Sequence, residues 1–213
     1  MADLPFADRR QAGRRLAVEV ARLGLERPLV LGVPRGGVPV AAEVARALDG
    51  ELDVIVVRKV GAPGNPELGL GAVGPEGEPY LDPRIMASVG PSDEHLEREV
   101  AAQREEARRR VLAYRGSHEQ VTLAGRDVVV VDDGIATGGT VLAAGHILRA
   151  AGPRRLVLAV PVAPRESLTR VAEAYDEVVC PFTPDPYFAV GQWYDDFRQV
   201  TDAEVESLLS GSG

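Results

Sequence analysis

Five short apolar runs recur along the chain, and turn-forming residues bound each of them. None of the runs alternates polar and apolar positions, so each one predicts a strand that is buried on both faces. Strands of this kind are typical of a parallel sheet with helices on both sides. The five runs are PLVLGV (28–33), DVIVVR (53–58), DVVVVD (127–132), RLVLAVPV (155–162) and EVVC (177–180).

Segments with helical periodicity lie between or beside these runs. They cover residues 9–24, 39–48, 140–152 and 164–175. Strand and helix in alternation predict an α/β fold with a doubly wound, mainly parallel five-stranded sheet flanked by helices. A chain of 213 residues suits one domain of this kind, which we expect to span residues 1–213. Ligands of such sheets bind beyond the carboxyl ends of the strands.

The alternation is interrupted between the second and third runs. Residues 59–82 are rich in glycine and proline, and we expect a mobile loop with a short hairpin that pairs LGAV (70–73) with EPYL (78–81). Residues 92–116 predict a long inserted helix with charged, solvated faces. Its apolar stripe consists of Leu96, Val100, Ala107, Val111 and Tyr114.

The C-terminal segment, residues 182–213, holds most of the aromatic side chains and ends in a short helix that the capping box TDAE (201–204) opens. The aromatic residues have two interpretations. They could stack on a planar ligand, or they could cover an edge of the hydrophobic core, as aromatic residues near a chain end often do. The residues concerned are Phe182, Tyr187, Phe188, Trp193 and Tyr194.

Charge and cysteine content exclude several classes of function. The chain has 24 basic and 32 acidic residues, a formal net charge of -8 that would repel nucleic acid, so we expect no nucleic-acid partner. One cysteine, Cys180, excludes an intramolecular disulfide, and we expect it to be a small buried apolar residue. No signal peptide and no apolar run of about 18 residues are apparent, so we expect a cytoplasmic protein without membrane contact.

The segment VVVVDDGIATGGT (128–140) carries the strongest chemical signal. Its valines predict a central strand that delivers Asp132 and Asp133 to the carboxyl end of the sheet. The glycines and threonines that follow open a helix, where free amide groups and the helix dipole favour a phosphate. Two carboxylates beside a phosphate site are explained if the ligand also carries hydroxyl groups and Mg²⁺, held directly or through water. The spacing matches neither a P-loop nor a G-x-G-x-x-G motif.

This segment resembles the 5-phosphoribosyl-1-diphosphate (PRPP) binding motif of the type I phosphoribosyltransferases. The resemblance implies that Asp132 and Asp133 hold the ribose 2′ and 3′ hydroxyls and, through water, Mg²⁺. It implies that the turn after them wraps the 5′-phosphate. That turn consists of Ala136, Thr137, Gly138, Gly139 and Thr140.

Two further segments are similar to loops of the same family. GVPRGGVPVA follows the first strand and resembles the diphosphate loop, which gives that role to Arg35, Gly36 and Gly37. VRKVGAPGNPELG resembles the start of the mobile catalytic loop, where basic residues reach the diphosphate; these are Arg58 and Lys59, the only lysine of the chain. The Arg-Lys pair is similar to the one in adenine phosphoribosyltransferase.

The resemblance implies an enzyme that uses Mg²⁺ to transfer the 5-phosphoribosyl group from PRPP to a nitrogenous base or related acceptor, releasing diphosphate. Ala136 stands where the hypoxanthine-guanine members have an aspartate, which argues against that specificity and leaves the acceptor open. Two alternatives remain: adenine phosphoribosyltransferase, and a non-catalytic regulatory protein that binds PRPP. The whole layout most resembles bacterial phosphoribosyltransferase-domain proteins whose acceptor is unassigned. A homodimer is expected only because dimers are usual in the family.

No general base is evident from the motif. Glu67 and Glu78 in the glycine-rich segment are candidates, and exposed loop glutamates are the alternative. The aromatic C-terminal segment is the expected hood over the acceptor. The histidines share no metal-ligand spacing, and we expect solvated or helix-surface roles for His95, His118 and His146.

Overall fold

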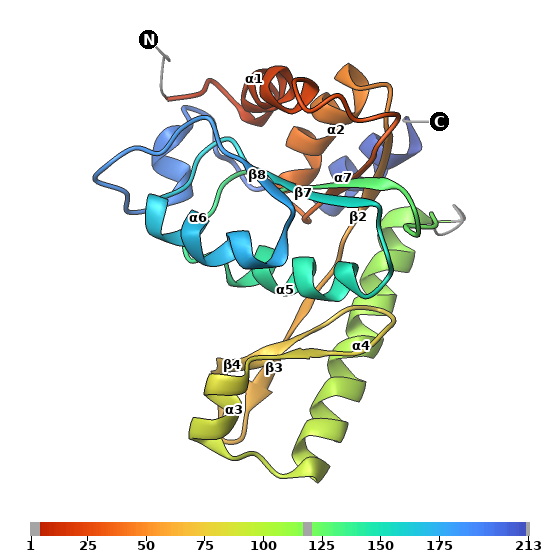
Figure 1. Ribbon diagram of the computed structural model, residues 1–213, viewed down its shortest axis with the longest axis vertical. Helices are drawn as coiled ribbons and strands as arrows, with labels where there is room; N and C mark the ends of the chain where they lie inside the picture. Colours follow the sequence, from red (N-terminus) through yellow and green to blue (C-terminus); the bar gives the residue numbers. More distant parts are fainter. Residues whose placement is uncertain (1–4, 117–120, 212–213) are drawn as a thin grey trace.

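The computed structural model describes residues 5–116 and 121–211, so His118 lies outside the described residues. Its centre is a parallel sheet in the order β2-β1-β6-β7-β8 (Figure 1). The fold class expected from the sequence is confirmed: an α/β fold with a five-stranded parallel sheet between helices. The strands are β1 (Leu29–Gly32), β2 (Glu51–Val54), β6 (Asp127–Val131), β7 (Arg155–Ala159) and β8 (Glu177–Val179).

Each face of the sheet has its own apolar core, because the central strand β6 is buried on both sides. Val129 and Val131 belong to one core, whereas Val128 and Val130 belong to the other, and all four are 0% exposed. One face is covered by α1 (Arg9–Ala21), α2 (Gly37–Ala47), α7 (Asp202–Ser210) and the C-terminal half of α4 (Asp93–Arg115). The other is covered by α5 (Gly139–Arg149), α6 (Arg165–Val171) and the short 3-10 helix η1 (Ala172–Ala174).

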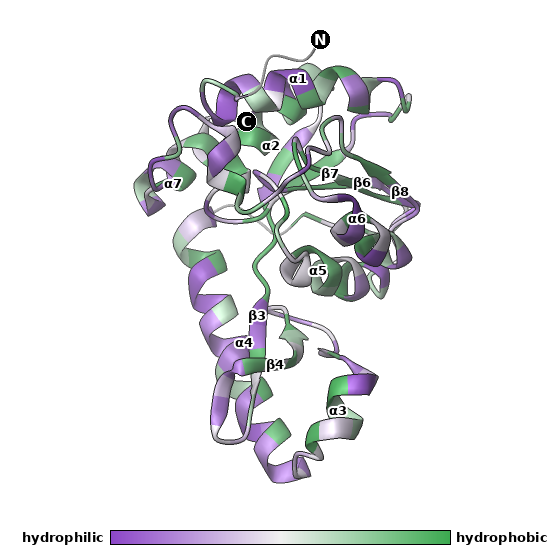
Figure 2. Cartoon of the chain, turned by 90° about the vertical axis from the view of Figure 1, so that its left-hand side faces the viewer, coloured by the Kyte–Doolittle hydropathy of each residue, from purple (hydrophilic) through white to green (hydrophobic). Residues whose placement is uncertain are grey.

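The segment between β2 and β6 forms an arm that projects from the body (Figure 2). It contains a three-stranded antiparallel sheet, with β3 (Arg58–Ala62), β4 (Asn65–Val73) and β5 (Tyr80–Leu81), followed by α3 (Pro83–Val89). The expected hairpin is present, since Gly71 pairs with Leu81 and Ala72 pairs with Tyr80. Residues 59–62 and 65–69, which the sequence indicated as loop, are strands instead. Strand β2 ends at Val54, so the apolar run 53–58 continues out of the sheet into the arm.

The arm folds because its glycines allow close packing around a small apolar cluster of its own. A Cβ on Gly71 would lie 2.0 Å from the Tyr80 carbonyl oxygen, so only glycine fits at this strand pairing. Val60, Leu70 and Val73 are buried at the centre of the cluster. Helix α4 lies where the sequence predicts the long inserted helix, and it joins this cluster to the body. Its apolar stripe packs on the arm at one end and on the main core at the other.

The C-terminal helix begins as the capping box predicted. Thr201 Oγ1 accepts from the Glu204 amide at 3.2 Å, and the Glu204 carboxylate accepts from the Thr201 amide at 2.8 Å. Among the residues that the structure describes, no helix has the length and apolar character needed to cross a membrane.

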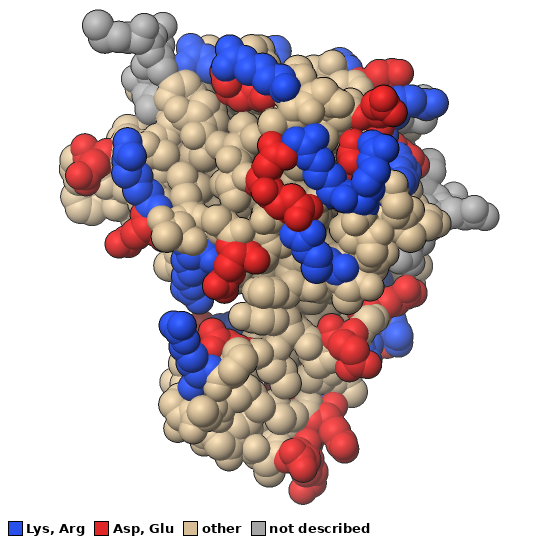
Figure 3. Space-filling model, in the orientation of Figure 1, with Lys and Arg blue, Asp and Glu red and all other residues tan. Residues whose placement is uncertain are grey.

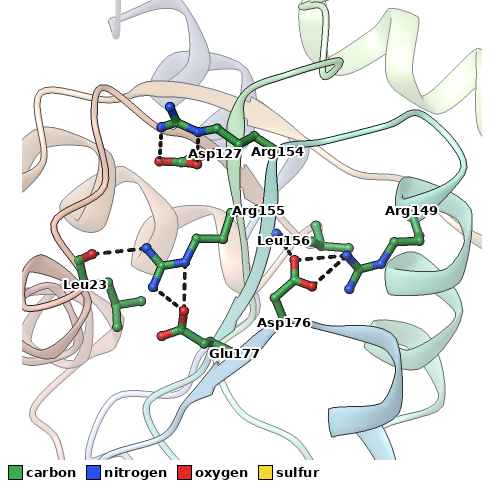
Figure 4. A network of polar contacts seen from close by, with 8 residues as sticks. All are labelled: Leu23, Asp127, Arg149, Arg154, Arg155, Leu156, Asp176 and Glu177. Carbon is green, nitrogen blue, oxygen red and sulfur yellow. Dashed lines mark hydrogen bonds and ion pairs between the residues drawn. The ribbon is translucent and has the colours of Figure 1, made fainter.

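The amino ends of the strands are closed by pairs of arginine and carboxylate side chains (Figure 4). Arg154 donates to both oxygens of Asp127 at 2.9 and 2.7 Å, and Arg149 donates to Asp176 at 2.8 Å. Arg155 pairs with Glu177 and also donates to the Leu23 carbonyl at 3.1 Å. The hydrogen bonds from Arg154 hold the pKa of Asp127 below its ordinary 3.8. The charges of these side chains are therefore compensated at this edge.

We predict that Asp127→Asn lowers the free energy of unfolding by about 2 kcal/mol at pH 7, since hydrogen bonds to charged groups contribute about 1.5–3 kcal/mol. Because the pKa of Asp127 is lowered in the folded state, its contribution to stability is fully present above pH 3.8. That contribution is lost as the pH falls through the pKa of the folded state. The difference between variant and wild type should therefore shrink below about pH 4. Urea unfolding at pH 7, 4 and 3 measures this. Glu97→Gln, an exposed site on α4, is the control, and a difference independent of pH would contradict the prediction.

Candidate active site

The two predicted loops meet at the carboxyl edge of the sheet. Strands β1 and β6 are neighbours, so the turn at residues 34–37 lies beside Asp132 and Asp133. A Cβ on Gly36 would lie 2.1 Å from Oδ2 of Asp133. A Cβ on Gly37 would lie 2.6 Å from the Val131 carbonyl oxygen and 2.9 Å from Cα of Asp132. The turn and the acid pair can approach this closely only because both positions are glycine.

The two acids lie in an environment that resists ionisation. Burial raises the pKa of Asp132 well above its ordinary value, and the adjacent charge of Asp133 raises it further. Burial also raises the pKa of Asp133, while the guanidinium of Arg9 acts in the opposite direction. The Asp133 amide donates to Oδ1 of Asp132 at 2.8 Å, which fixes the Asp132 carboxylate relative to the backbone of its neighbour. A site like this favours ligands that bring hydroxyl groups or a cation.

Arg9 and Tyr194 hold Asp133 from the two ends of the chain, and the PRPP-binding motif includes neither residue. Arg9 Nε donates to Oδ2 of Asp133 at 2.8 Å, with side chains 10% and 13% exposed. The Tyr194 hydroxyl donates to the Asp133 carbonyl oxygen. One sequence signal was available for Arg9. A basic residue in the first turn of a helix is opposed by the helix dipole, which favours a tertiary partner, but this signal applies equally to the exposed Arg10 and does not single out Arg9.

The turn between β6 and α5, to which the resemblance assigns the 5′-phosphate, leads directly into the N-terminus of α5. Gly138 has φ +77°, a conformation that favours glycine, and it caps the N-terminus of α5. The Ala136 carbonyl accepts from Ser167 Oγ at 2.5 Å, which ties the turn to α6. Thr137, Gly139 and Thr140 remain exposed at the start of the helix. Amide groups of a helix N-terminus and two hydroxyls are thus available at one place.

A cavity of about 250 Å³ lies between this turn and the arm. Lys59 of β3 lines it together with Arg170 of α6, and so do Thr137, Gly139 and Thr140. The structure therefore brings Lys59 to the phosphate turn, although the two are far apart in sequence.

Arg58 is not brought to the same cavity. Successive residues of a strand point to opposite faces, and the Arg58 guanidinium donates to Gln103 of α4 at 3.2 Å. Arg35 lines another cavity, of about 400 Å³, with Arg109, Arg110 and Tyr114 of α4. Its guanidinium lies 3.5 Å from Asp202.

The aromatic segment mainly covers an edge of the core, the second of its two interpretations. Phe6 from the N-terminal segment packs on Phe182 and Tyr194, with ring centroids 5.4 Å apart in both pairs. Tyr187 and Trp193 pack against this cluster, while Phe188 is 82% exposed. The short helix η2 (Val190–Trp193) lies within the segment. The Tyr187 hydroxyl and Trp193 Nε1 are buried without a hydrogen-bond partner among the described residues.

The remaining candidates occupy less specific positions. Glu67 is exposed and accepts from Lys59 Nζ at 3.1 Å, and Glu78 is exposed. His95 Nε2 donates to the Gly61 carbonyl at 2.9 Å, and the His146 ring stacks on Tyr80 at 4.1 Å between centroids, so both rings contact the arm. Cys180 is partly buried, and burial raises the pKa of its thiol to about 12.

The donor set at the acid pair suits one mode of Mg²⁺ binding. Within the described part of the chain, no three His, Cys, Asp or Glu side chains converge on a metal position. Asp132 and Asp133 each have one oxygen engaged, with the Asp133 amide and with Arg9 respectively. Mg²⁺ commonly keeps several waters and binds one or two carboxylates together with ligand phosphates. The site fits a Mg²⁺ ion that arrives with a phosphorylated ligand.

Comparisons with known proteins identify relatives of this chain. A protein of Mycobacterium tuberculosis (strain ATCC 25618 / H37Rv), named "Putative phosphoribosyl transferase Rv0571c", is 45% identical over 204 residues, which are 96% of this chain and 46% of that protein. The chain thus spans about half the length of the curated relatives it matches.

Solved structures show the same fold. TT1426 from Thermus thermophilus is 52% identical and matches with a TM-score of 0.88, over 99% of this chain and 100% of that one. The AQ2163 protein from Aquifex aeolicus, at 14% identity, matches over 94% of this chain and 84% of its own with a TM-score of 0.53. The phosphoribosyl transferase domain family matches residues 7–196, which include the whole sheet and its loops. The chain therefore belongs to the phosphoribosyl transferase domain family.

Proposed function

We propose that this chain binds PRPP with Mg²⁺ and transfers its 5-phosphoribosyl group to a nitrogenous base or related acceptor, releasing diphosphate. The observation that carries the proposal is the close approach of Gly36 and Gly37 to Asp133 and Asp132. It joins the turn assigned to diphosphate with the acids assigned to ribose. The phosphate turn lies directly after the acids in sequence. A ligand with all three groups in this order fits the edge of the sheet.

In the proposed reaction the bond between ribose C1 and the diphosphate oxygen breaks, and diphosphate leaves with the electron pair. The acceptor nitrogen forms the new bond to C1 and loses a proton. Mg²⁺, when bound, would neutralise charge on the diphosphate, and Asp132 and Asp133 would hold the ion through water.

The protein's own groups orient the ribose and stabilise developing charge. Asp132 and Asp133 accept hydrogen bonds from the ribose hydroxyls, and Thr137 and Thr140 with the α5 amides hold the 5′-phosphate. Lys59 supplies a compact cation to the departing diphosphate. The diphosphate role of Arg35 stays a prediction, because its guanidinium lines another cavity and lies 3.5 Å from Asp202. Gly37 contributes space rather than its amide, which donates to the Val33 carbonyl at 2.9 Å. The general-base role of Glu67 or Glu78 and the homodimer stay predictions.

A calorimetric titration with PRPP tests the acid pair. We expect the wild type to bind PRPP only when Mg²⁺ is present. We expect the double variant Asp132→Asn, Asp133→Asn to bind PRPP at least about a hundredfold more weakly, because it loses two charge-assisted hydrogen bonds. Glu166→Gln, an exposed acid on α6, should bind as the wild type does. Binding without turnover across candidate bases would favour a regulatory PRPP-binding protein. Absence of binding by the wild type would refute the proposed function.

The side chains of Lys59 and Arg58 point to opposite faces of β3, so substitutions at the two positions should affect diphosphate recognition differently. Lys59→Gln should weaken PRPP binding by about tenfold or more, because the Lys59 side chain lines the cavity beside the phosphate turn. Arg58→Gln should change PRPP affinity less, because its guanidinium is engaged by Gln103. The same titrations measure both variants. Equal losses of PRPP affinity in the two variants would show that the opposite orientation of the two side chains on β3 does not decide which one contacts PRPP.

The close approach of the two turns predicts that Gly36→Ala disables the site without unfolding the protein. A methyl group 2.1 Å from Oδ2 of Asp133 must displace the carboxylate, so PRPP affinity should fall by about tenfold or more. Gly211→Ala is the control, because its methyl group would come no closer than 3.4 Å to the Ser207 carbonyl oxygen. Thermal unfolding of both variants checks the fold. Unchanged affinity in Gly36→Ala would contradict the geometry.

A further inference from the structure

Arg9 is held at the acid pair by four groups from distant parts of the chain. Its Nε donates to Oδ2 of Asp133 at 2.8 Å, and its Nη1 donates to the Arg198 carbonyl at 2.9 Å. The guanidinium carbon lies 4.0 Å from the centroid of the Phe197 ring and 5.9 Å from that of Tyr194. The side chain is 10% exposed. An arginine in this position is ordered by contacts, not by solvent.

The position is unfavourable for a cation unless a specific partner compensates it. Arg9 is the first residue of α1, where the helix dipole favours negative charge, and its burial removes hydration from the guanidinium. The neighbouring Arg10 is exposed and meets the same dipole with its hydration retained. The pairing with Asp133 and the ring of Phe197 offset these costs for Arg9.

Arg9 restricts where the Asp133 carboxylate can point. It engages Oδ2, while the Tyr194 hydroxyl engages the Asp133 carbonyl and Gly36 packs against the same carboxylate. The carboxylate is thereby fixed on several sides before any ligand arrives. A fixed carboxylate binds a sugar hydroxyl without the entropy loss of ordering its own side chain.

We propose that Arg9 is a positioning residue for ribose recognition, holding the Asp133 carboxylate in the orientation that meets a sugar hydroxyl. The inference rests on the proposed function, in which Asp133 contacts ribose. It goes beyond that function by assigning a role to a residue outside the PRPP-binding motif. It also assigns a role to the C-terminal segment, because Phe197 and Arg198 hold the guanidinium that holds Asp133.

The test compares sugar phosphates that differ only in hydroxyl groups. Ribose 5-phosphate, 2-deoxyribose 5-phosphate and 3-deoxyribose 5-phosphate are titrated into wild type, Arg9→Met and Arg9→Lys with Mg²⁺ present. The wild type should prefer ribose 5-phosphate to at least one deoxy sugar by about tenfold. Arg9→Met should reduce that preference to less than about threefold while binding of the deoxy sugar changes little. Arg9→Lys keeps the positive charge but lacks the planar set of N–H donors of a guanidinium, so its preference for ribose 5-phosphate should be intermediate.

Arg10→Met is the matched control, and it should keep the wild-type preference. If Arg9→Met still preferred ribose 5-phosphate as strongly as the wild type does, the proposal would be overturned. An equal loss of affinity for all three sugar phosphates would also overturn it, because that result indicates a merely structural role. If Arg9→Met does not fold, Arg9→Lys decides the question: an intermediate preference supports the proposal and an unchanged one overturns it. A wild type that binds none of the sugars and no PRPP refutes the proposed function itself, whereas a defect confined to the variants does not.

Discussion

The close packing of two turns at the carboxyl ends of β1 and β6 is the constraint on which the candidate site depends. Adjacent parallel strands are fixed about 4.8 Å apart, so the groups that follow them compete for very little space. Two positions in this crowded region are glycine, which has no side chain. Gly36 and Gly37 let the backbone of one turn lie against the carboxylates of the other. A larger residue at either position would separate the groups assigned to diphosphate and to ribose.

The two edges of the sheet use charge in different ways. At the amino edge, Asp127 and Asp176 have lowered pKa values because arginines and backbone amides donate to them. At the carboxyl edge, burial raises the pKa values of Asp132 and Asp133, and the charge of Asp133 raises the pKa of Asp132 further. Ion pairs at the first edge stabilise the fold, whereas the second edge retains electrostatic strain that a suitable ligand relieves. On the face that Figure 3 shows, basic and acidic side chains are interspersed.

The sequence predicted what depends on local pattern and short spacing. The apolar runs predicted the positions of the five strands, although the edge strand β8 is half-buried and not buried on both faces, and TDAE predicted the start of α7. The arm was harder to predict, because Gly61, Gly69 and Gly71 are typical of loops. Here they permit strands to pack closely, and that depends on neighbours such as Tyr80 and Pro66 that single-sequence periodicity does not reveal. Arg9 was missed for a similar reason, since its partner lies 124 residues away.

Because Lys59, the only lysine in the chain, lies on a strand of the arm and not in a loop, ligand binding needs to order less of its surroundings. In a flexible loop, a lysine that meets a phosphate must lose backbone and side-chain freedom when it binds, at a cost of about 1–2 kcal/mol per ordered backbone residue. Lys59 lies instead on a strand whose neighbours Val60 and Ala62 are buried, so its backbone is ordered without a ligand. The remaining costs are the ordering of its side chain and the release of its Nζ from the carboxylate and carbonyl oxygens of Glu67, where the exposed ion pair is of the kind that contributes less than about 1 kcal/mol. A strand-borne cation with a weak, replaceable partner is therefore well suited to receive a diphosphate.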